Sequence, residues 1–400
     1  MSTVIKSPLR IPITLPYFGQ EERDAIVQPL DTGWVVQGPL VQEFERRFCE
    51  FTESRYAAAT TSCTTALQLA IAALGVKPGD EVIVPAFTWV ATPNVVEWMH
   101  ATPVFCDISL DTFNIDVTQA AALVTPRTVG IIPVHLFGLC AEMSAIAALA
   151  SRHRLWVLED AACAFGAYYG DRHAGTFGDA GCFSFHPRKS ITTGEGGMVT
   201  TGRADLHALI GSLRDHGASR TDRDRHESAG AFLLPEYPHL GFNYRMTDLQ
   251  GALGCVQMNR ARWLLRERAR VASRYSERLA DLSWLARPST PSGYTHGWQS
   301  YVCLFQPDAP TLAESSTLSL RRNALMASLE ARGIATRQGT HAPVLQQFYR
   351  EKYGFTPDHF PNATIAERIS LSLPLFAQLS DDDVDIVVTE LARAFRESHD

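Results

Sequence analysis

Short apolar runs alternate with helical patterns from about residue 56 onward. Five such runs, bounded by Gly, Pro or Asp, cover residues 81–85, 103–106, 130–134, 155–158 and 181–185. Runs that are apolar throughout and separated by helices are typical of a parallel sheet covered on both faces. The pattern therefore predicts an α/β fold with a mostly parallel central sheet. In such folds the chemistry gathers in loops at the carboxyl ends of the strands.

Helical patterns precede and follow this block. Apolar residues recur at helical spacing over 41–51, and the segment 381–397 shows the same periodicity. Thr247 and Gln250 form a Thr-x-x-Gln capping box, which predicts the start of a long helix that reaches about Leu279.

We expect that long helix to lead from a large domain to a smaller one. The large domain would cover residues 1–255, with an N-terminal arm of about residues 1–30. A smaller C-terminal α+β domain would cover residues 256–400. A chain of 400 residues exceeds what one hydrophobic core usually holds, which agrees with this division.

Composition narrows the class of protein. Hydrophobic residues make up 46% and charged residues 20%, which excludes a disordered chain, a collagen-like fibre and a coiled coil. The net charge of −7 makes nucleic acid an unexpected partner. The eight cysteines form no C-x-x-C pair and no zinc-type cluster, so we expect no metal and reduced thiols. With no secretory signal and no apolar span, the sequence predicts a cytoplasmic protein that does not enter a membrane.

A hydroxyl-rich turn at 60–65 precedes an apolar helical segment that stops at Gly75. Small hydroxyl residues at a strand-to-helix turn cap the helix, or they hold a phosphate against its free N–H groups. The sequence leaves both readings open. Glu159 and Asp160 directly follow the apolar run 155–158. One of them is expected to point outward, and the other either caps the next helix or serves as a functional acid.

Lys189 lies in a loop at 186–197 that is rich in glycine and hydroxyl residues. A lysine is unusual in a loop of this composition. Gly194, Gly196 and Gly197 permit tight backbone paths that would fix the direction of the lysine. An amine held in this way can form a Schiff base with a carbonyl. Asp160, Ser184 and Lys189 together could anchor pyridoxal 5'-phosphate (PLP) through its ring nitrogen, phosphate and aldehyde.

At these residues the chain resembles the DegT/StrS group of sugar aminotransferases, which are fold-type I PLP enzymes. The lysine loop is the most specific match, and the resemblance runs over nearly the whole chain. The other matching segments are 32–38, 62–67, 84–91, 133–138, 159–162, 240–247, 360–363 and 371–375.

The resemblance implies roles for individual residues. Lys189 is the catalytic residue that forms the Schiff base and moves a proton. Asp160 pairs with the ring nitrogen, and Trp89 stacks on the ring.

The phosphate is expected to lie against Ser184 and the helix start at Ser62, Cys63 and Thr64. Asn243, with Arg245 nearby, would reach the cofactor of a neighbouring subunit. The resemblance therefore implies a homodimer with shared active sites.

Two positions depart from the family pattern. Cys63 replaces the usual glycine of Ser-Gly-Thr, and Cys163 replaces the usual Gln, His or Glu near the 3-hydroxyl of the cofactor. A thiol is a weak hydrogen-bonding group. A related branch that removes a sugar hydroxyl carries histidine at the lysine position, and the presence of Lys189 disfavours it.

Other polar residues have two readings. His186 and His341 would contact substrate or be ordinary loop histidines, and Arg245 is a further substrate candidate. His135 is expected to be buried and hydrogen-bonded near the site. The charged stretch 214–226 is either a solvated loop or a contact for a diphosphate.

The expected reaction moves an amino group from an amino acid, L-glutamate, to a keto sugar, a nucleotide-linked 3- or 4-keto-6-deoxy sugar. The alternatives are a PLP-dependent sugar dehydratase, a cyclitol aminotransferase or a non-catalytic regulatory homologue. The sequence leaves open the nucleotide, the position and stereochemistry of amination, and assembly beyond a dimer.

Overall fold

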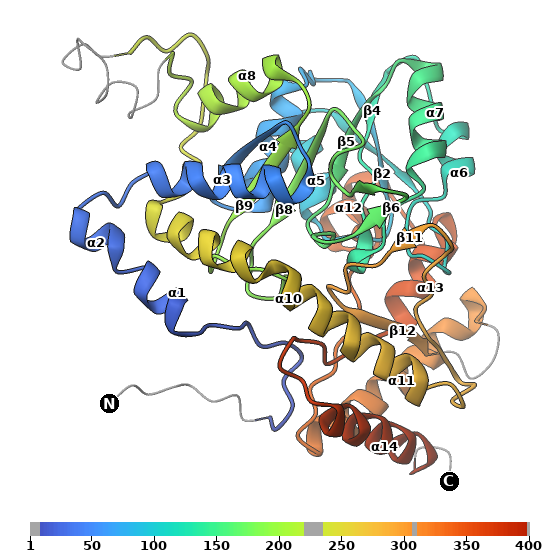
Figure 1. The fold of residues 1–400 in the computed structure, drawn as a ribbon. Helices are drawn as coiled ribbons and strands as arrows, with labels where there is room; N and C mark the ends of the chain where they lie inside the picture. Colours follow the sequence, from blue (N-terminus) through green and yellow to red (C-terminus); the bar gives the residue numbers. More distant parts are fainter. Residues whose placement is uncertain (1–8, 220–234, 306–309, 398–400) are drawn as a thin grey trace.

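The structure is a computed structural model that describes residues 9–219, 235–305 and 310–397. Its centre is a seven-stranded sheet with the strand order β1-β9-β8-β5-β4-β2-β3 (Figure 1). All neighbouring pairs from β8 to β3 are parallel, and β9 alone runs antiparallel to both of its neighbours. The mostly parallel sheet predicted from the sequence is confirmed.

The strands of this sheet are short and mostly buried. Their bounds are Tyr56–Thr60 (β1), Glu81–Pro85 (β2), Thr102–Cys106 (β3), Thr128–Ile131 (β4), Trp156–Asp160 (β5), Ala180–Ser184 (β8) and Gly197–Thr201 (β9). The helices of this part are Gln20–Ala25 (α1), Gln28–Thr32 (α2), Pro39–Thr52 (α3), Cys63–Ala73 (α4), Ala91–Trp98 (α5), Val117–Ala122 (α6), Met143–His153 (α7) and Ala204–Arg214 (α8).

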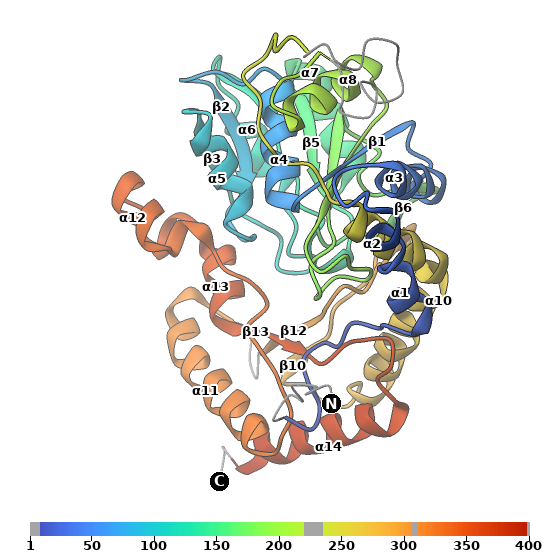
Figure 2. The same ribbon diagram turned by 90° about the vertical axis from the view of Figure 1, so that its left-hand side faces the viewer.

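Helices cover both faces of the sheet because side chains alternate along each strand. On one face, Val82 and Val84 of β2 belong to the same buried cluster as residues of α4, α5 and α8. On the other face, Ile83 packs with α7. Near the β1 edge of that second face, Phe183 packs with α3 and α10. Figure 2 shows the two layers of helices on either side of the sheet.

The predicted long helix is α10, Asp248–Arg278, and Thr247 caps it as expected. The Thr247 hydroxyl accepts the Gln250 amide hydrogen at 3.3 Å, and the Gln250 side-chain oxygen accepts the Thr247 amide hydrogen at 3.1 Å. Helix α10 packs against α3 in the large-sheet region and α14 in the C-terminal part. The expected domain boundary at 255/256 falls inside this helix, and the division into domains stays a prediction.

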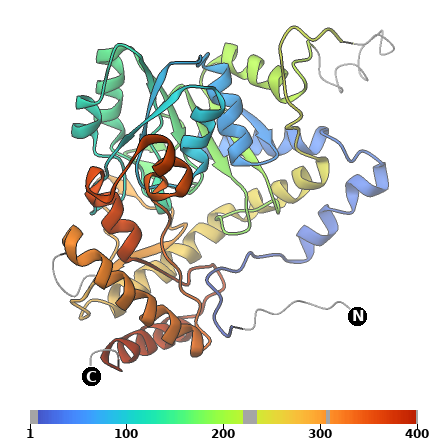
Figure 3. The ribbon, with the colours of Figure 1, turned by 180° about the vertical axis from the view of Figure 1, so that it is seen from behind.

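The C-terminal part is built on a small antiparallel sheet, β10-β12-β13, which agrees with the expected α+β unit. In Figure 3 the blue N-terminal segment reaches this part, where the Leu375 amide donates to the Ile13 carbonyl at 3.1 Å. Two remaining short strands, β6 and β7, pair with each other, and β6 also pairs with β11. The bounds are Tyr168–Tyr169 (β6), Arg172–His173 (β7), Leu285–Ala286 (β10), Tyr294–Thr295 (β11), Tyr301–Phe305 (β12), Leu312–Ala331 (α11), Gln347–Tyr353 (α12), Pro361–Ile369 (α13), Ser370–Leu373 (β13) and Asp381–Glu397 (α14).

Candidate active site

A cavity of about 510 Å³ lies where the carboxyl ends of the parallel strands face the C-terminal part. Residues that follow β2, β4, β5 and β8 line it on one side, and the segments 299–300, 337–341 and 372–375 line it on the other. Its location is the one expected for an α/β sheet. Lining residues predicted from the sequence are Ser62, Cys63, Thr64, Trp89, Asp160, Cys163, Ser184, His186, Lys189 and His341.

Asp160 is the last residue of β5 and is 4% exposed. Its Oδ2 accepts a hydrogen bond from the Thr92 hydroxyl at 2.7 Å, and its Oδ1 accepts the Ala162 amide hydrogen at 3.1 Å. Burial raises the pKa of this carboxyl, although the two hydrogen bonds and the charge of Lys189 oppose the shift. A buried carboxylate at a cavity wall is suited to pair with a cationic group inside the cavity.

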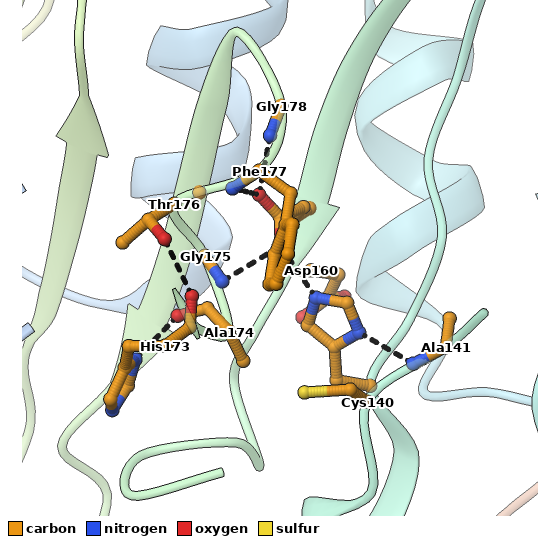
Figure 4. A network of polar contacts seen from close by, with 12 residues as sticks. Cys140, Ala141, Asp160, His173, Ala174, Gly175, Thr176, Phe177 and Gly178 are labelled. Carbon is orange, nitrogen blue, oxygen red and sulfur yellow. Dashed lines mark hydrogen bonds and ion pairs between the residues drawn. The ribbon is translucent and has the colours of Figure 1, made fainter. Parts of the chain in front are cut away.

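Glu159 points to the opposite side of β5, but it is fully buried and does not reach solvent. Figure 4 shows the loop whose Gly175, Phe177 and Gly178 amides donate to its two carboxylate oxygens at 2.6–2.7 Å. His135 completes this network. Its Nδ1 accepts the Ala141 amide hydrogen, so its Nε2–H donates to Glu159 at 2.8 Å.

This network answers two questions left by the sequence. Asp160 is the carboxylate that faces the cavity, and His135 is buried and hydrogen-bonded near the site, as expected. Four donors on Glu159 fix the end of β5, and they thereby fix the direction of the next residue, Asp160. The prediction that one of the two carboxylates points outward is wrong, because Glu159 points away from the cavity but is buried beneath a loop.

Lys189 reaches the cavity from the loop after β8, and its Nζ lies 3.1 Å from the Sγ of Cys163. Its amide donates to the His186 carbonyl at 2.8 Å. Gly197 begins β9 and lies against the turn before α4. A Cβ on Gly197 would fall 2.4 Å from the Ser62 carbonyl carbon, so only glycine fits there. The tight path predicted for this loop is confirmed at this residue.

The start of α4 presents backbone N–H groups to the cavity. Ser62 is the N-cap, and its Oγ accepts the Thr65 amide hydrogen at 3.2 Å. Cys63 and Thr64 follow as the first two helical residues, and both line the cavity. The capping reading therefore holds for Ser62, while the other free N–H groups of the first turn remain suited to an anion.

Arg268 on α10 is a site residue that sequence reasoning missed. It is 3% exposed and donates to the Lys189 carbonyl at 3.2 Å. Its other terminal nitrogen donates to the carbonyls of Trp298, Gln299 and Leu375 at 3.2–3.4 Å. Burial lowers the pKa of Arg268 to about 10. This guanidinium therefore joins the backbone of the lysine loop to the C-terminal part.

The outer wall of the cavity is less buried. Trp89 is 55% exposed, and its ring centre lies 5.9 Å from that of His341. His341 also lies 3.9 Å from Glu367. Burial lowers the pKa of His186, whose Nδ1 accepts the Arg188 amide hydrogen at 3.2 Å.

Asn243 and Arg245 do not line this cavity. Asn243 is exposed and forms an isolated bridge with Asp215, and Arg245 is ion-paired with Asp215. Their roles in a neighbouring subunit or toward substrate stay predictions. Of the charged stretch 214–226, residues 220–226 lie outside the described part of the chain, as does the beginning of the predicted N-terminal arm.

Sequence reasoning also missed Thr92, Arg188 and Arg337. Thr92 acts on Asp160 from 68 residues away, and no spacing rule links the two. Arg188 and Arg337 line the cavity, and each stands within four residues of a histidine that the sequence did single out.

Among the described residues, no group of three or more His, Cys, Asp or Glu side chains is placed to hold a metal. No helix in the described ranges is long and apolar enough to cross a membrane.

The residues of this cavity fit PLP. Asp160 is a buried carboxylate whose protein partners are all neutral donors, which suits a ring N–H cation. The first turn of α4, pressed against Gly197, suits a phosphate, and Lys189 supplies an amine that faces the cavity. When bound, PLP supplies an aldehyde that takes up an amino group and a ring that withdraws electrons from the reacting carbon.

Comparisons with known proteins agree with this class of site. A model of the DegT/DnrJ/EryC1/StrS aminotransferase family matches residues 16–392. The spore coat polysaccharide biosynthesis protein SpsC of Bacillus subtilis is 38% identical over 378 residues, which cover 94% of this chain and 95% of SpsC.

Two solved structures show the same fold. The putative sugar aminotransferase Spr1654 of Streptococcus pneumoniae, PMP-form, is 27% identical with a TM-score of 0.89, covering 97% of this chain and 100% of its own. PseC of Helicobacter pylori, an aminotransferase involved in pseudoaminic acid biosynthesis, is 26% identical with a TM-score of 0.88 and coverages of 97% and 99%.

The fold and site thus define a fold-type I, PLP-dependent transaminase. The chain belongs to the DegT/DnrJ/EryC1/StrS aminotransferase family.

Proposed function

We propose that this enzyme transfers an amino group from L-glutamate to a nucleotide-linked 3- or 4-keto-6-deoxy sugar. The observation that carries the proposal is the joint placement of Lys189, Asp160 and the start of α4 around one cavity. The names of similar proteins support a sugar as acceptor, since Spr1654 is a putative sugar aminotransferase and SpsC serves polysaccharide biosynthesis.

In this proposal Lys189 moves a proton to and from the reacting carbon through its Nζ. The loop backbone holds it in place, because the Lys189 amide and carbonyl are both hydrogen-bonded. Asp160 keeps a ring nitrogen protonated through its buried carboxylate. Trp89, which lines the cavity, would stack on the ring of the cofactor.

We also propose that the enzyme acts as a homodimer in which Asn243 reaches the site of the other subunit. Asn243 is exposed and lies outside the cavity of its own chain, as this role requires. Size-exclusion chromatography with light scattering tests the assembly. Complementation between inactive Lys189→Ala and Asn243→Ala subunits tests sharing: recovery of activity on mixing supports it, and no recovery refutes it.

The reaction is tested in two half-reactions. L-Glutamate added to PLP-loaded enzyme should bleach the visible absorption of the bound cofactor and release one 2-oxoglutarate per site. A nucleotide keto sugar should then restore the absorption and gain an amino group by mass. Lys189→Ala should do neither. A product mass that shows loss of water would instead establish a dehydratase, and an unchanged spectrum with every amino donor would refute the proposal.

A further inference from the structure

Two arginine side chains face the cavity without an acidic partner. Arg188 precedes Lys189 in the lysine loop, and Arg337 comes from the C-terminal part. Within the described residues, neither guanidinium takes part in an ion pair or a side-chain hydrogen bond. Many other arginines are paired, for example Arg214 with Glu45 at 2.6 Å and Arg274 with Asp385 at 2.6 Å.

The two guanidinium groups also repel one another. Burial is the main cause that lowers the pKa of Arg337, and the charge of Arg188 lowers it further. Two like charges that line one cavity are unfavourable unless an anion lies between or beside them. The arrangement is therefore suited to a ligand that carries negative oxygens.

The backbones of both residues are held in place. The Gln299 side-chain amide donates to the Arg188 carbonyl at 3.0 Å. Arg337 exchanges two backbone hydrogen bonds with Ser372 of β13, at 2.7 and 3.3 Å. The two side chains thus start from fixed positions on opposite walls of the cavity, one from each part of the fold.

The acidic residues that line the cavity have other roles, so both arginines are available to bind substrate. Asp160 and Glu195 are the acids among the described lining residues, and the cofactor, when bound, would engage Asp160 and Lys189. Its phosphate would lie against Ser184 and the start of α4. The charge of Glu195 acts on His186, where it raises the pKa against the effect of burial. This leaves two guanidinium groups with no assigned partner.

We propose that Arg188 and Arg337 form an oxyanion site that binds the negatively charged group of the substrates, separate from the cofactor phosphate. This inference rests on the proposed function, which supplies two ligands of the required chemistry: the carboxylate of the amino donor and the diphosphate of the nucleotide sugar. Guanidinium groups bind both kinds of oxyanion through paired N–H donors. Because the two substrates take turns in one cavity, one pair of arginines can serve both.

The test uses PLP-loaded enzyme and the variants Arg188→Met, Arg337→Met and their double. Arg396→Met is the matched control, because Arg396 is exposed on α14 and is not among the residues that line the cavity. Inorganic pyrophosphate binding is measured by calorimetry, and the glutamate dependence of cofactor bleaching is measured by stopped flow. Each single substitution should weaken binding by about tenfold or more for the anion that the site holds, since charged hydrogen bonds are lost.

The two measurements, pyrophosphate binding and the glutamate dependence of bleaching, distinguish which substrate anion the site binds. Weaker pyrophosphate binding identifies the diphosphate, weaker glutamate binding identifies the donor carboxylate, and loss of both identifies a shared site. The proposal is overturned if neither arm changes, or if the variants instead lose PLP affinity to the same extent. If wild-type enzyme does not respond to glutamate at all, the proposed function fails, whereas the pyrophosphate arm still tests the oxyanion site.

Discussion

Replacing Thr92 with valine should weaken PLP binding by removing one hydrogen bond to Asp160. The Thr92 hydroxyl donates to Asp160 Oδ2 at 2.7 Å, and Thr92 itself is fully buried. Its Oγ1 also lies 3.2 Å from that of Thr88, which must donate because the Thr92 hydrogen points to Asp160. Valine keeps the shape of the side chain but supplies no donor to the carboxylate.

The size of the effect follows from the charge and burial of the acceptor. A hydrogen bond to a charged group contributes about 1.5–3 kcal/mol. Without it, the pKa of Asp160 rises further above its ordinary range, because burial then meets less opposition. The lower end of that range corresponds to about a tenfold weaker affinity for PLP, which needs Asp160 in its charged form.

The assay is titration of apo-enzyme with PLP, followed by the visible absorption of the bound cofactor. Thr92→Ser is the matched control, since it keeps the hydroxyl and loses only the methyl group. The reasoning is refuted if Thr92→Val binds PLP as tightly as wild type. It also fails if Thr92→Ser loses as much affinity as Thr92→Val, because packing would then be the cause.

Four further predictions concern the surroundings of the site. Glu159→Gln should lower the free energy of unfolding by about 3 kcal/mol, measured in urea, since two hydrogen-bond donors face each carboxylate oxygen and the amide places its NH₂ group against one of these pairs of donors. Arg268→Met should lower the free energy of unfolding by about as much and should reduce kcat, because carbonyls on both sides of the cavity lose their hydrogen-bond donor. Arg268→Lys should show a smaller loss of both stability and kcat. Burial lowers the pKa of His173 to about 4 and that of His296 to about 3, so the unfolded chain takes up protons before the folded chain does as the pH falls below 6.5. Each histidine should therefore lower the free energy of unfolding by about 2 kcal/mol between pH 7 and pH 5. A urea midpoint that stays constant over that range would contradict this prediction. His341→Ala should leave bleaching by glutamate unchanged and raise KM for the keto sugar, because its backbone carbonyl still accepts the Thr88 amide hydrogen while the side chain is lost from the outer wall.

The framework of the fold follows from local sequence patterns. The run 81–85 is β2 as predicted, and the segment 381–397 is α14. The run 130–134 is only partly strand, because β4 ends at Ile131 and Pro133 has no N–H for a ladder. Strands β1 and β9 are not among the five runs bounded from the sequence, and the alanine run of β1 carries little strand preference.

The site was predictable where chemistry and position coincide in one segment. Asp160 and Lys189 each stand in a short motif next to a strand, and the structure places both at the cavity. Thr92 and Arg268 were not predictable, because they act through contacts with residues 68 and 79 positions away. Such pairings depend on how helices dock on the sheet, and no periodicity encodes that.

The burial of the cavity residues separates two tasks of the enzyme. Asp160 and Cys63 at the start of α4 are buried, and the side chains of Asp160 and Ser62 accept backbone N–H hydrogens, so the groups that fit the cofactor are fixed before any ligand arrives. Arg188 is exposed and His341 is half-buried at the outer wall, and neither is among the residues that fit the cofactor. Substitutions at these two positions can therefore alter which substrate binds while the groups that fit the cofactor stay in place. This physical separation explains how one fold can serve aminotransferases that act on different sugars.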